Sequence, residues 1–222
     1  MAHIIAVVQV KGGAGRSTIA TNLAGLLSRR LKTVLIDCDM PQGTAAAWYA
    51  IRAQDKPETA KHLTLRAAHF HTELVREVEA TAGEADVLVI DCPPRIAEVT
   101  RAALILADLA LVPLGASAAE IWATTDLLKT VDEARKVKPQ VDARILWNRI
   151  RANTRAAHEL PEAVRDFKLK ELETRLGYRV AYSEALARGL TVLEWPDELA
   201  RAEMLALGQE VGRIISHKQK RG

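Results

Sequence analysis

The chain has 222 residues and a formal net charge of +3, with 49% hydrophobic and 27% charged residues. These values are typical of a soluble globular protein with one ordinary domain. They exclude a membrane-spanning chain, because the apolar runs are shorter than the about 18 residues needed to cross a bilayer. Two cysteines, Cys38 and Cys92, are too few for a disulfide framework, and we expect buried thiols. The N-terminus lacks the features of a signal peptide, so we expect a cytoplasmic protein.

Apolar runs of strand length alternate with segments of helical spacing along the chain. In its first part the predicted elements are a strand at His3–Val10, a helix at Ser17–Leu31, a strand at Thr33–Asp37, a helix at Thr44–Ala53, a short edge strand near 62–68, a helix at Thr72–Thr81 and a strand within Asp86–Pro94. The remaining predicted elements are a helix at Ala97–Ala107, a strand at Leu109–Gly115, a helix at Ala118–Val137, a strand at Ala143–Ile150, a charged helix at Ala156–Leu176, a strand at Tyr178–Tyr182 and a helix at Leu199–Ser216.

This alternation predicts an α/β fold with one doubly wound, mostly parallel sheet and helices on both faces. We expect a single domain over residues 1–217 and a basic tail over 218–222. Ligands of such sheets bind beyond the carboxyl ends of the strands. Four polar stretches fall at these ends, namely Lys11–Ser17, Asp37–Gly43, Asp91–Pro94 and Asn148.

The first stretch, "KGGAGRST", is rich in glycine and leads into a predicted helix. Its glycines allow the backbone N–H groups to converge at the helix N-terminus, an arrangement that favours a phosphate. Ser17 stands where a hydroxyl would bind Mg²⁺, and Thr18 is placed to donate to an α-phosphate. A plain strand–helix connection would also use glycine, so the loop alone leaves both interpretations open.

A second signal comes from "VLVIDCPP", four apolar residues that end in Asp91. Nucleotide-hydrolysing proteins with phosphate-binding loops hold Mg²⁺ with a strand-end aspartate of this kind. The alternative is that Asp91 only caps the following loop. The glycine-rich loop upstream favours the metal.

One residue departs from the phosphate-loop pattern G-x-x-x-x-G-K-[ST], because Arg16 occupies the lysine position and Lys11 stands at the start of the loop. A guanidinium is wider than an ammonium but still pairs with phosphate oxygens. We expect Mg²⁺ and ATP to bind, and hydrolysis to ADP to be slow. The alternative is a nucleotide-binding interaction protein with little or no hydrolysis.

The combined motifs, K-G-G-x-G-x-[ST]-T, D-x-D-x-P-Q-G, D-x-P-P and a later N-R, resemble the ParA/MinD deviant-Walker ATPases, and most of all the small ParA-type partition proteins. The similarity runs from residue 4 to about residue 205. Besides Arg16, Met40 departs from the pattern, since it adds a residue to the usual D-P-Q-G.

The resemblance implies a role for each matching residue. Lys11 would cross a dimer interface to the phosphates of the other subunit, and Asn148 would bind the adenine edge. Asp39 would position the attacking water, with Asp37 as a rival because of Met40. Ser17 and Asp91 would bind Mg²⁺, and Asp39 is a further metal candidate. The residues expected to cradle the phosphates are Gly12, Gly13, Ala14, Gly15, Arg16, Ser17 and Thr18.

The resemblance also implies partners: a homodimer formed on ATP binding, nonspecific DNA that would place the protein on the nucleoid, and a cargo-bound adaptor similar to ParB. Residues 144–222 hold 15 Lys/Arg against 11 Asp/Glu, consistent with a polyanionic partner. The DNA candidates are Arg149, Arg151, Arg155, Arg175, Arg179, Lys218, Lys220 and Arg221.

Two other classes of function remain as alternatives. MinD-like proteins dock on membranes, but the final helix here lacks the bulky aromatic residues of interfacial helices, so we do not expect membrane binding. A metabolic phosphate-loop enzyme would turn over only with a small acceptor and would not bind DNA.

Overall fold

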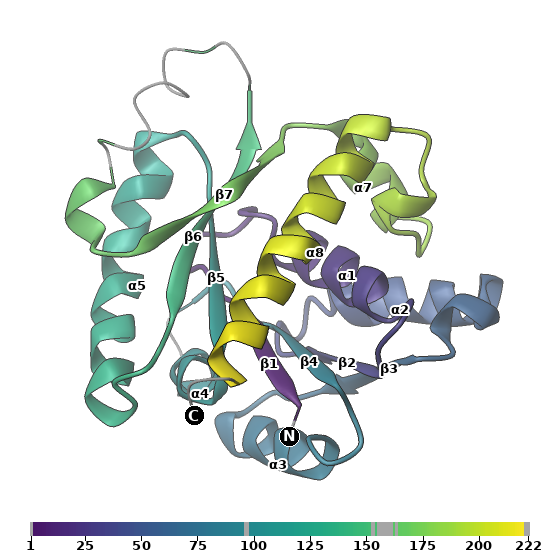
Figure 1. Ribbon diagram of the computed structural model, residues 1–222, viewed down its shortest axis with the longest axis horizontal. Helices are drawn as coiled ribbons and strands as arrows, with labels where there is room; N and C mark the ends of the chain where they lie inside the picture. Colours follow the sequence, from purple (N-terminus) through teal and green to yellow (C-terminus); the bar gives the residue numbers. More distant parts are fainter. Residues whose placement is uncertain (1, 96–97, 152–153, 155–161, 163, 220–222) are drawn as a thin grey trace.

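The structure is a computed structural model that describes residues 2–95, 98–151, 154, 162 and 164–219 (side chains to 217). Its centre is one seven-stranded sheet in which every pair of neighbours is parallel, in the order β3-β2-β4-β1-β5-β6-β7 (Figure 1). The strands are β1 (His3–Val7), β2 (Thr33–Asp37), β3 (Leu63–Ala67), β4 (Val87–Asp91), β5 (Leu109–Leu114), β6 (Ala143–Ile150) and β7 (Lys170–Gly177).

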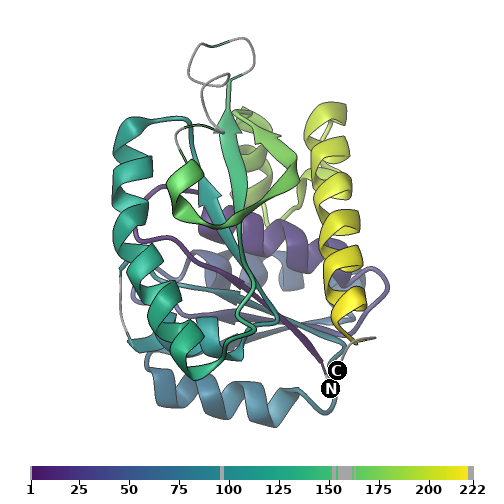
Figure 2. The ribbon, with the colours of Figure 1, turned by 60° about the vertical axis from the view of Figure 1, so that its left-hand side comes forward.

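Helices cover both faces of this sheet. The helices are α1 (Arg16–Leu27), α2 (Thr44–Asp55), α3 (His71–Thr81), α4 (Glu98–Leu106), α5 (Ala118–Val137), α7 (Val180–Leu186) and α8 (Glu198–Gln219), and the 3-10 turns are η1 (Pro57–Ala60), η2 (Arg165–Phe167) and η3 (Val192–Glu194). Figure 2 shows α8 on one side of the sheet and α3 and α5 on the other.

Alternate residues of the central strands pack into two separate hydrophobic cores, one on each face of the sheet. Ile5 and Val7 of β1 pack with α1, α2, α7 and α8, whereas Ala6 packs with α3, α4 and α5. All residues of β2, β4 and β5 are buried. This explains their continuous apolar sequence, because a parallel strand between two helical layers has no polar face. The predicted doubly wound α/β architecture is therefore confirmed.

Most predicted elements are present, and three match to the residue, namely Thr33–Asp37, Ala118–Val137 and Ala143–Ile150. The predicted edge strand is β3 at one margin of the sheet. Small differences occur at the ends; β1, for example, stops at Val7 rather than Val10.

Two predictions in the C-terminal third were wrong. The end of the predicted helix at 156–176 is strand β7, which lies parallel to β6 at the second margin, and the 3-10 turn η2 shortly precedes it. The buried residues of β7 are Leu172 and Leu176, four apart, a spacing that suits a strand and a helix equally. Residues 155–161 lie outside the described part of the chain.

The predicted strand at 178–182 is instead the start of α7. Its buried residues are Ala181, Tyr182 and Ala185, which follow helical spacing once the segment is extended beyond Tyr182.

Candidate functional site

The sheet brings the four polar stretches to one edge. Asp37 of β2 and Val7 of β1 are both paired in register with Asp91 of β4, so the loops that follow these strands start side by side. Asn148 of β6 reaches the same place, where its Nδ2 donates to the carbonyl of Ala14 at 2.8 Å. The predicted gathering of these stretches is a feature of the structure.

The glycine loop has the conformation that a phosphate-binding loop needs. Gly13 and Gly15 have φ angles of +76° and +89°, in the left-handed region that favours glycine. Gly15 is also the N-cap of α1. Because no side chain at this position accepts their hydrogen bonds, the first N–H groups of the helix remain available to a ligand. A Cβ at Gly15 would collide with the Asn148 amide, so the loop and β6 are in close contact here.

Arg16 is directed into the protein. Its side chain is 5% exposed, and its Nε donates to the carbonyl of Cys92 at 2.8 Å. Its Nη1 donates to the carbonyls of Gln9 and Lys11 at 2.9 and 2.8 Å, and its Nη2 lies 3.5 Å from Asp39 Oδ2. The guanidinium thus connects the glycine loop to the segments that follow β2 and β4.

Asp91 is the most unusual carboxylate of the site. It is fully buried, and among the described residues no group makes a well-aligned hydrogen bond to either of its oxygens. Burial raises its pKa to about 7. The Ser17 hydroxyl, close enough to interact with the carboxyl, is the main opposing group, Arg16 also opposes the rise, and Asp37 and Asp39 add to it. A buried carboxylate without a partner is costly unless a cation compensates it.

The surroundings of Asp91 fit a hard divalent cation that keeps several waters. No group of three or more His, Cys, Asp or Glu side chains able to hold a metal occurs in the described residues. Mg²⁺ commonly uses one or two protein ligands together with phosphate oxygens. The Ser17 hydroxyl and the Asp91 carboxylate match that donor set.

The two aspartates after β2 have different surroundings. Asp37 is fully buried, and its two oxygens accept hydrogen bonds from the backbone N–H groups of Asp39 and Ala46, both at 2.9 Å. Asp39 is 7% exposed, and within the described part of the chain its carboxylate has the long 3.5 Å contact to Arg16 as its one side-chain partner. Asp37 therefore stabilises the turn into α2, whereas the Asp39 carboxylate is less engaged in internal hydrogen bonds.

Lys11 lies at the start of the loop with its side chain 37% exposed, and its Nζ is 3.8 Å from Glu120 Oε1 in the first turn of α5. The neighbouring Gln9 donates to the Pro113 carbonyl and the Thr124 hydroxyl, both at 3.0 Å. These contacts attach α5 to the end of β1. Neither Gln9 nor Glu120 belongs to a sequence motif, and only their position beside the loop distinguishes them.

A cavity of about 390 Å³ opens beside the loop. Its wall includes Asn148, Arg149 and Tyr178, and Arg149 Nη1 donates to the Gly13 carbonyl at 2.7 Å. The guanidinium carbons of Arg149 and Arg151 lie 5.5 and 4.8 Å from the centre of the Tyr178 ring. Tyr178 was missed as a site residue because the sequence placed it in a strand.

Three of the arginines predicted to contact DNA lie at or beside this cavity. Arg149 and Arg179 line it, and Arg151 lies over the ring of Tyr178. Arg179 also forms an ion pair with Glu203 at 2.7 Å. Arg175 is exposed on β7. Arg155, Lys220 and Arg221 lie outside the described residues, and the side chain of Lys218 is not described.

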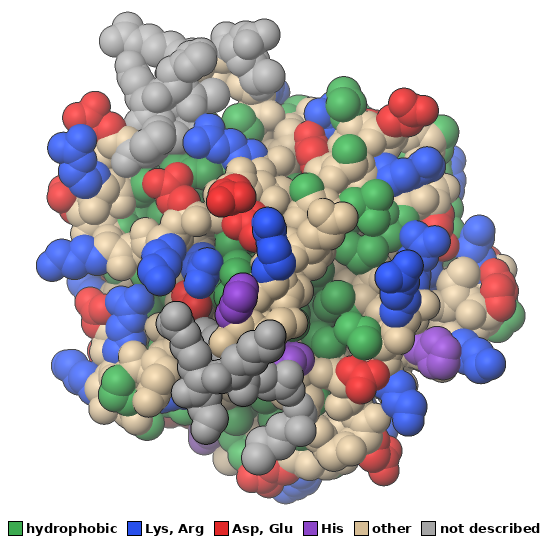
Figure 3. Space-filling model, viewed as in Figure 1, with side chains coloured by type: hydrophobic (Ala, Val, Ile, Leu, Met, Phe, Trp, Pro, Cys, Tyr) green, Lys and Arg blue, Asp and Glu red, His purple; other side chains and the backbone are tan. Residues whose placement is uncertain are grey.

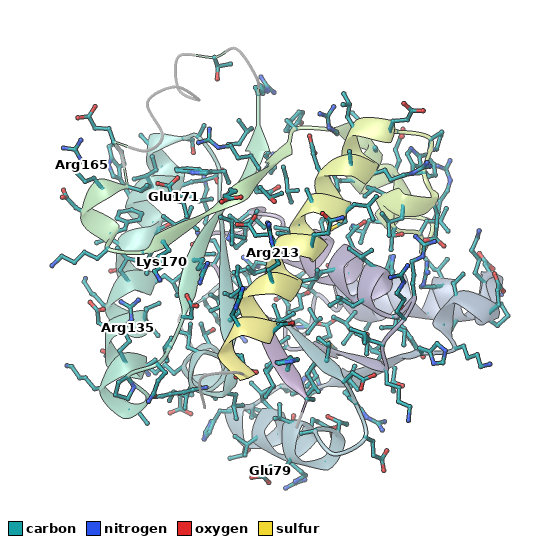
Figure 4. The ribbon with its side chains drawn as sticks, in the orientation of Figure 1. Glu79, Arg135, Arg165, Lys170, Glu171 and Arg213 are labelled. Carbon is teal, nitrogen blue, oxygen red and sulfur yellow. The ribbon has the colours of Figure 1, made fainter. Side chains whose placement is uncertain are left out.

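Another group of cations lies on the face drawn in Figure 4. Arg135, Arg165, Lys170 and Arg213 come from α5, η2, β7 and α8, and Glu171 lies among them. Figure 3 shows that acidic side chains are interspersed with the basic ones on this face. Lys170 and Arg213 border a second cavity of about 480 Å³ that also contains Asp142 and Glu210.

With this geometry in place, comparison with known proteins identifies the family. Residues 5–192 match the family model of the CobQ/CobB/MinD/ParA nucleotide-binding domain. The chain belongs to this family. The ParA/MinD members are nucleotide-binding ATPases, so the predicted resemblance is confirmed.

Several curated relatives act in partition or positioning, according to their names. The chain is 28% identical over 194 residues to the maintenance of carboxysome distribution protein A of Halothiobacillus neapolitanus, with 87% of this chain and 88% of the relative covered. It is 27% identical to the chromosome partitioning protein ParA of Myxococcus xanthus, with 99% and 91% covered. The family group is therefore the ParA-like partition and positioning ATPases.

Solved structures confirm the fold. The apo McdA of Cyanothece superposes with a TM-score of 0.79 at 17% identity, covering 95% of this chain and all of that one. The McdA–ATP complex from the same source gives 0.76 at 17% identity, with 95% and 96% covered. In the described part of this chain, no helix has both the length and the apolar character that a membrane crossing requires.

Proposed function

We propose that this protein is an ATP-dependent partition or positioning switch, which binds Mg²⁺ and ATP, pairs with a second copy, binds DNA without sequence preference and hydrolyses ATP slowly. The observation that carries the proposal is the buried, unpaired carboxylate of Asp91 beside Ser17, at the edge where the glycine loop begins a helix. A family whose relatives are named for partition and carboxysome distribution supports the biological role.

Nucleotide binding is assigned to the glycine loop and the cavity beside it. The N–H groups of residues Gly12–Thr18 would bind the phosphates, with the positive end of the α1 dipole behind them. The cavity that contains Asn148 and Tyr178 would hold the adenosine part. The Asn148 amide donates to the Ala14 carbonyl and so holds the glycine loop. In the proposed site it would also contact the adenine base.

Mg²⁺ supplies a counter-charge for the phosphates when it is bound. Ser17 and Asp91 would hold it, and Asp39 remains a further ligand candidate. Since two of the three site aspartates are fully buried, a cation between the carboxylates and the phosphates would relieve their mutual repulsion.

Slow hydrolysis is assigned to Arg16 and Asp39. The N–H groups of Arg16 are bound to protein oxygens, so position 16 supplies no free cation comparable to the usual lysine. Asp39, which would orient the attacking water, is in contact with the same guanidinium. We expect Arg16→Lys to raise the turnover rate; an unchanged or lower rate would remove Arg16 as the cause of slow hydrolysis.

The homodimer would be formed on ATP binding through Lys11, which would reach the phosphates of the second copy. DNA contacts are assigned to Lys and Arg side chains outside the site, and a cargo-bound adaptor would control the cycle. Membrane association is not part of the proposal.

The deciding experiment is DNA binding at several salt concentrations with ATP, with ADP and without nucleotide. Binding that requires ATP and weakens steeply with salt supports the switch, because each phosphate contact releases a counterion. Equal binding in all three states argues against it. Turnover that appears only with a small acceptor would indicate a metabolic enzyme instead.

One observation favours a second candidate, a nucleotide-dependent interaction protein without hydrolysis. It is the same engagement of Arg16 in internal hydrogen bonds. Phosphate release during many hours with Mg²⁺ and ATP separates the two: none is expected from the second candidate, and a slow, steady release is expected from the first.

A further inference from the structure

A further cavity lies at the opposite end of α1 from the glycine loop. It has a volume of about 390 Å³ and is bordered by the end of α1, by α2 and η1, and by the segment around η3. Ser28, the C-cap of α1, belongs to its wall, and the 12 residues of the helix separate it from the glycine loop by about 18 Å. Small-molecule sites have volumes of this order. We call it the Arg52 cavity.

Arg52 of α2 is a buried charge in the wall of this cavity. Its side chain is 3% exposed, and its Nη1 and Nη2 donate to the Glu194 carboxylate at 2.9 and 3.3 Å. Glu194 is fully engaged, because its Oε2 also accepts the backbone N–H and the hydroxyl of Thr191, both at 2.9 Å. The Arg52 Nε is buried and has no hydrogen-bond partner in the described part of the chain. One donor of a buried guanidinium is thus left for an acceptor that the protein does not supply.

Two other basic side chains border the Arg52 cavity, namely Arg29 and His62. Both residues are exposed, and neither side chain forms an ion pair with another described residue. The acids of the wall are Glu58, which is exposed, and Glu194, whose charge Arg52 balances. Arg29 and His62 are therefore available to a ligand.

His62 also borders an adjoining cavity of about 260 Å³. Its wall contains the basic residues Lys32, Lys61 and Arg66, with Glu84 as the acid among the lining residues. The shared histidine makes the two cavities neighbours. Together they offer more cations than a ligand with a single negative charge would use.

We propose that the Arg52 cavity binds a small molecule that carries phosphate groups. Guanidinium groups bind phosphate through two parallel hydrogen bonds, and the charge of a phosphate exceeds that of a carboxylate. A small ligand fits better than a nucleic acid, because Arg52 lies in the wall of a recess and a duplex contacts protruding cations. The inference goes beyond the proposed function and does not depend on it, since the glycine loop is at the other end of α1.

The test is a calorimetric titration with inorganic pyrophosphate at low ionic strength. It uses the Gly15→Ala protein, in which the left-handed glycine at φ +89° is replaced, so that the glycine loop does not compete for the probe. Arg29→Gln is added to remove one cation of the cavity. The matched control is Arg30→Gln, the next exposed arginine, which borders neither cavity.

We expect a dissociation constant of about 0.1 mM or tighter before the second substitution. Arg29→Gln should weaken binding by about fivefold, and Arg30→Gln by less than about twofold. Failure to bind pyrophosphate, or an equal loss with both glutamine variants, overturns the inference. Arg52 itself is left in place because a buried ion pair would lose one partner.

A second measurement locates the ligand in the otherwise unchanged protein. The imidazole proton signals are followed by NMR during the same titration, and the His62 signal is identified by its loss in His62→Gln. It should shift along the binding curve, whether or not the protein hydrolyses ATP or forms a dimer. A His62 signal that stays in place at saturation overturns the inference.

Two further probes test the class of ligand. Citrate bound as tightly as pyrophosphate would make this a carboxylate site, and a DNA duplex that requires Arg29 where pyrophosphate does not bind would make it a nucleic-acid surface. Either result overturns the proposal of a small phosphorylated ligand.

Discussion

Replacing Arg16 with lysine would remove a buried fork that joins three segments of the chain. One nitrogen of Arg16 binds the carbonyls of Gln9 and Lys11, and another binds the carbonyl of Cys92. A single ammonium can take over the first pair of carbonyls, which lie around one nitrogen. It cannot also reach the Cys92 carbonyl, which the guanidinium binds with Nε at another edge of its plane.

The expected cost follows from this geometry. One hydrogen bond from a charged donor is lost, worth about 1.5–3 kcal/mol, and the Cys92 carbonyl is left in a buried position without its partner. The contact to Asp39, at 3.5 Å, adds little. We therefore expect Arg16→Lys to lower the free energy of unfolding of the nucleotide-free protein by about 2–3 kcal/mol.

Urea denaturation followed by circular dichroism measures this change without nucleotide or metal. The control is Arg101→Lys, a surface exchange in a 3.2 Å ion pair with Glu133, for which we expect less than about 0.5 kcal/mol. An Arg16→Lys protein as stable as wild type would refute the role of Arg16 as an internal connection. It would indicate that the guanidinium is free to face the phosphates.

Three further predictions concern the site. Asp91 has a folded-state pKa of about 7 against an ordinary 3.8, so without metal its contribution lowers stability as pH rises from about 4 to 7. Asp91→Asn should remove this loss of stability, which reaches about 4 kcal/mol at pH 8, and should also abolish the stabilisation by Mg²⁺. Urea denaturation with and without metal measures both effects. A variant with unchanged pH dependence contradicts the assignment. Gly15→Ala should abolish nucleotide binding in a calorimetric titration, because φ at this position is +89° and the new methyl would meet Asn148, whereas Gly83→Ala, in open space, should bind normally. Trp122 is 73% exposed near the start of α5, two residues after Glu120, so its emission should shift to the blue when ATP pairs two copies, and Trp122→Phe should remove the shift. A wild-type spectrum that does not respond during dimerisation places Trp122 outside the interface.

Much of the fold and of the site could be predicted from local patterns in the sequence alone. The buried strands were found because a parallel strand between two helical layers must be apolar throughout, as Thr33–Asp37 shows except at its ends. The glycine loop was found because left-handed backbone at Gly13 and Gly15 requires glycine. The gathering of Lys11–Ser17, Asp91 and Asn148 at one edge followed from the parallel order of the strands.

Tertiary contacts decided what local pattern left open. Leu172 and Leu176 fit both periods, and only pairing with β6 makes their segment a strand. The direction of Arg16 depends on a carbonyl 76 residues away, and the support of the loop by Asn148 depends on one 134 residues away. The roles of Asp37 and Asp39 differ because two backbone N–H groups donate to the Asp37 carboxylate. Glu120 lies near Lys11 because α5 begins beside the end of β1. A hydrogen bond between residues far apart in the sequence leaves no periodic pattern along the chain. It can therefore be recognised only once the strands are placed side by side.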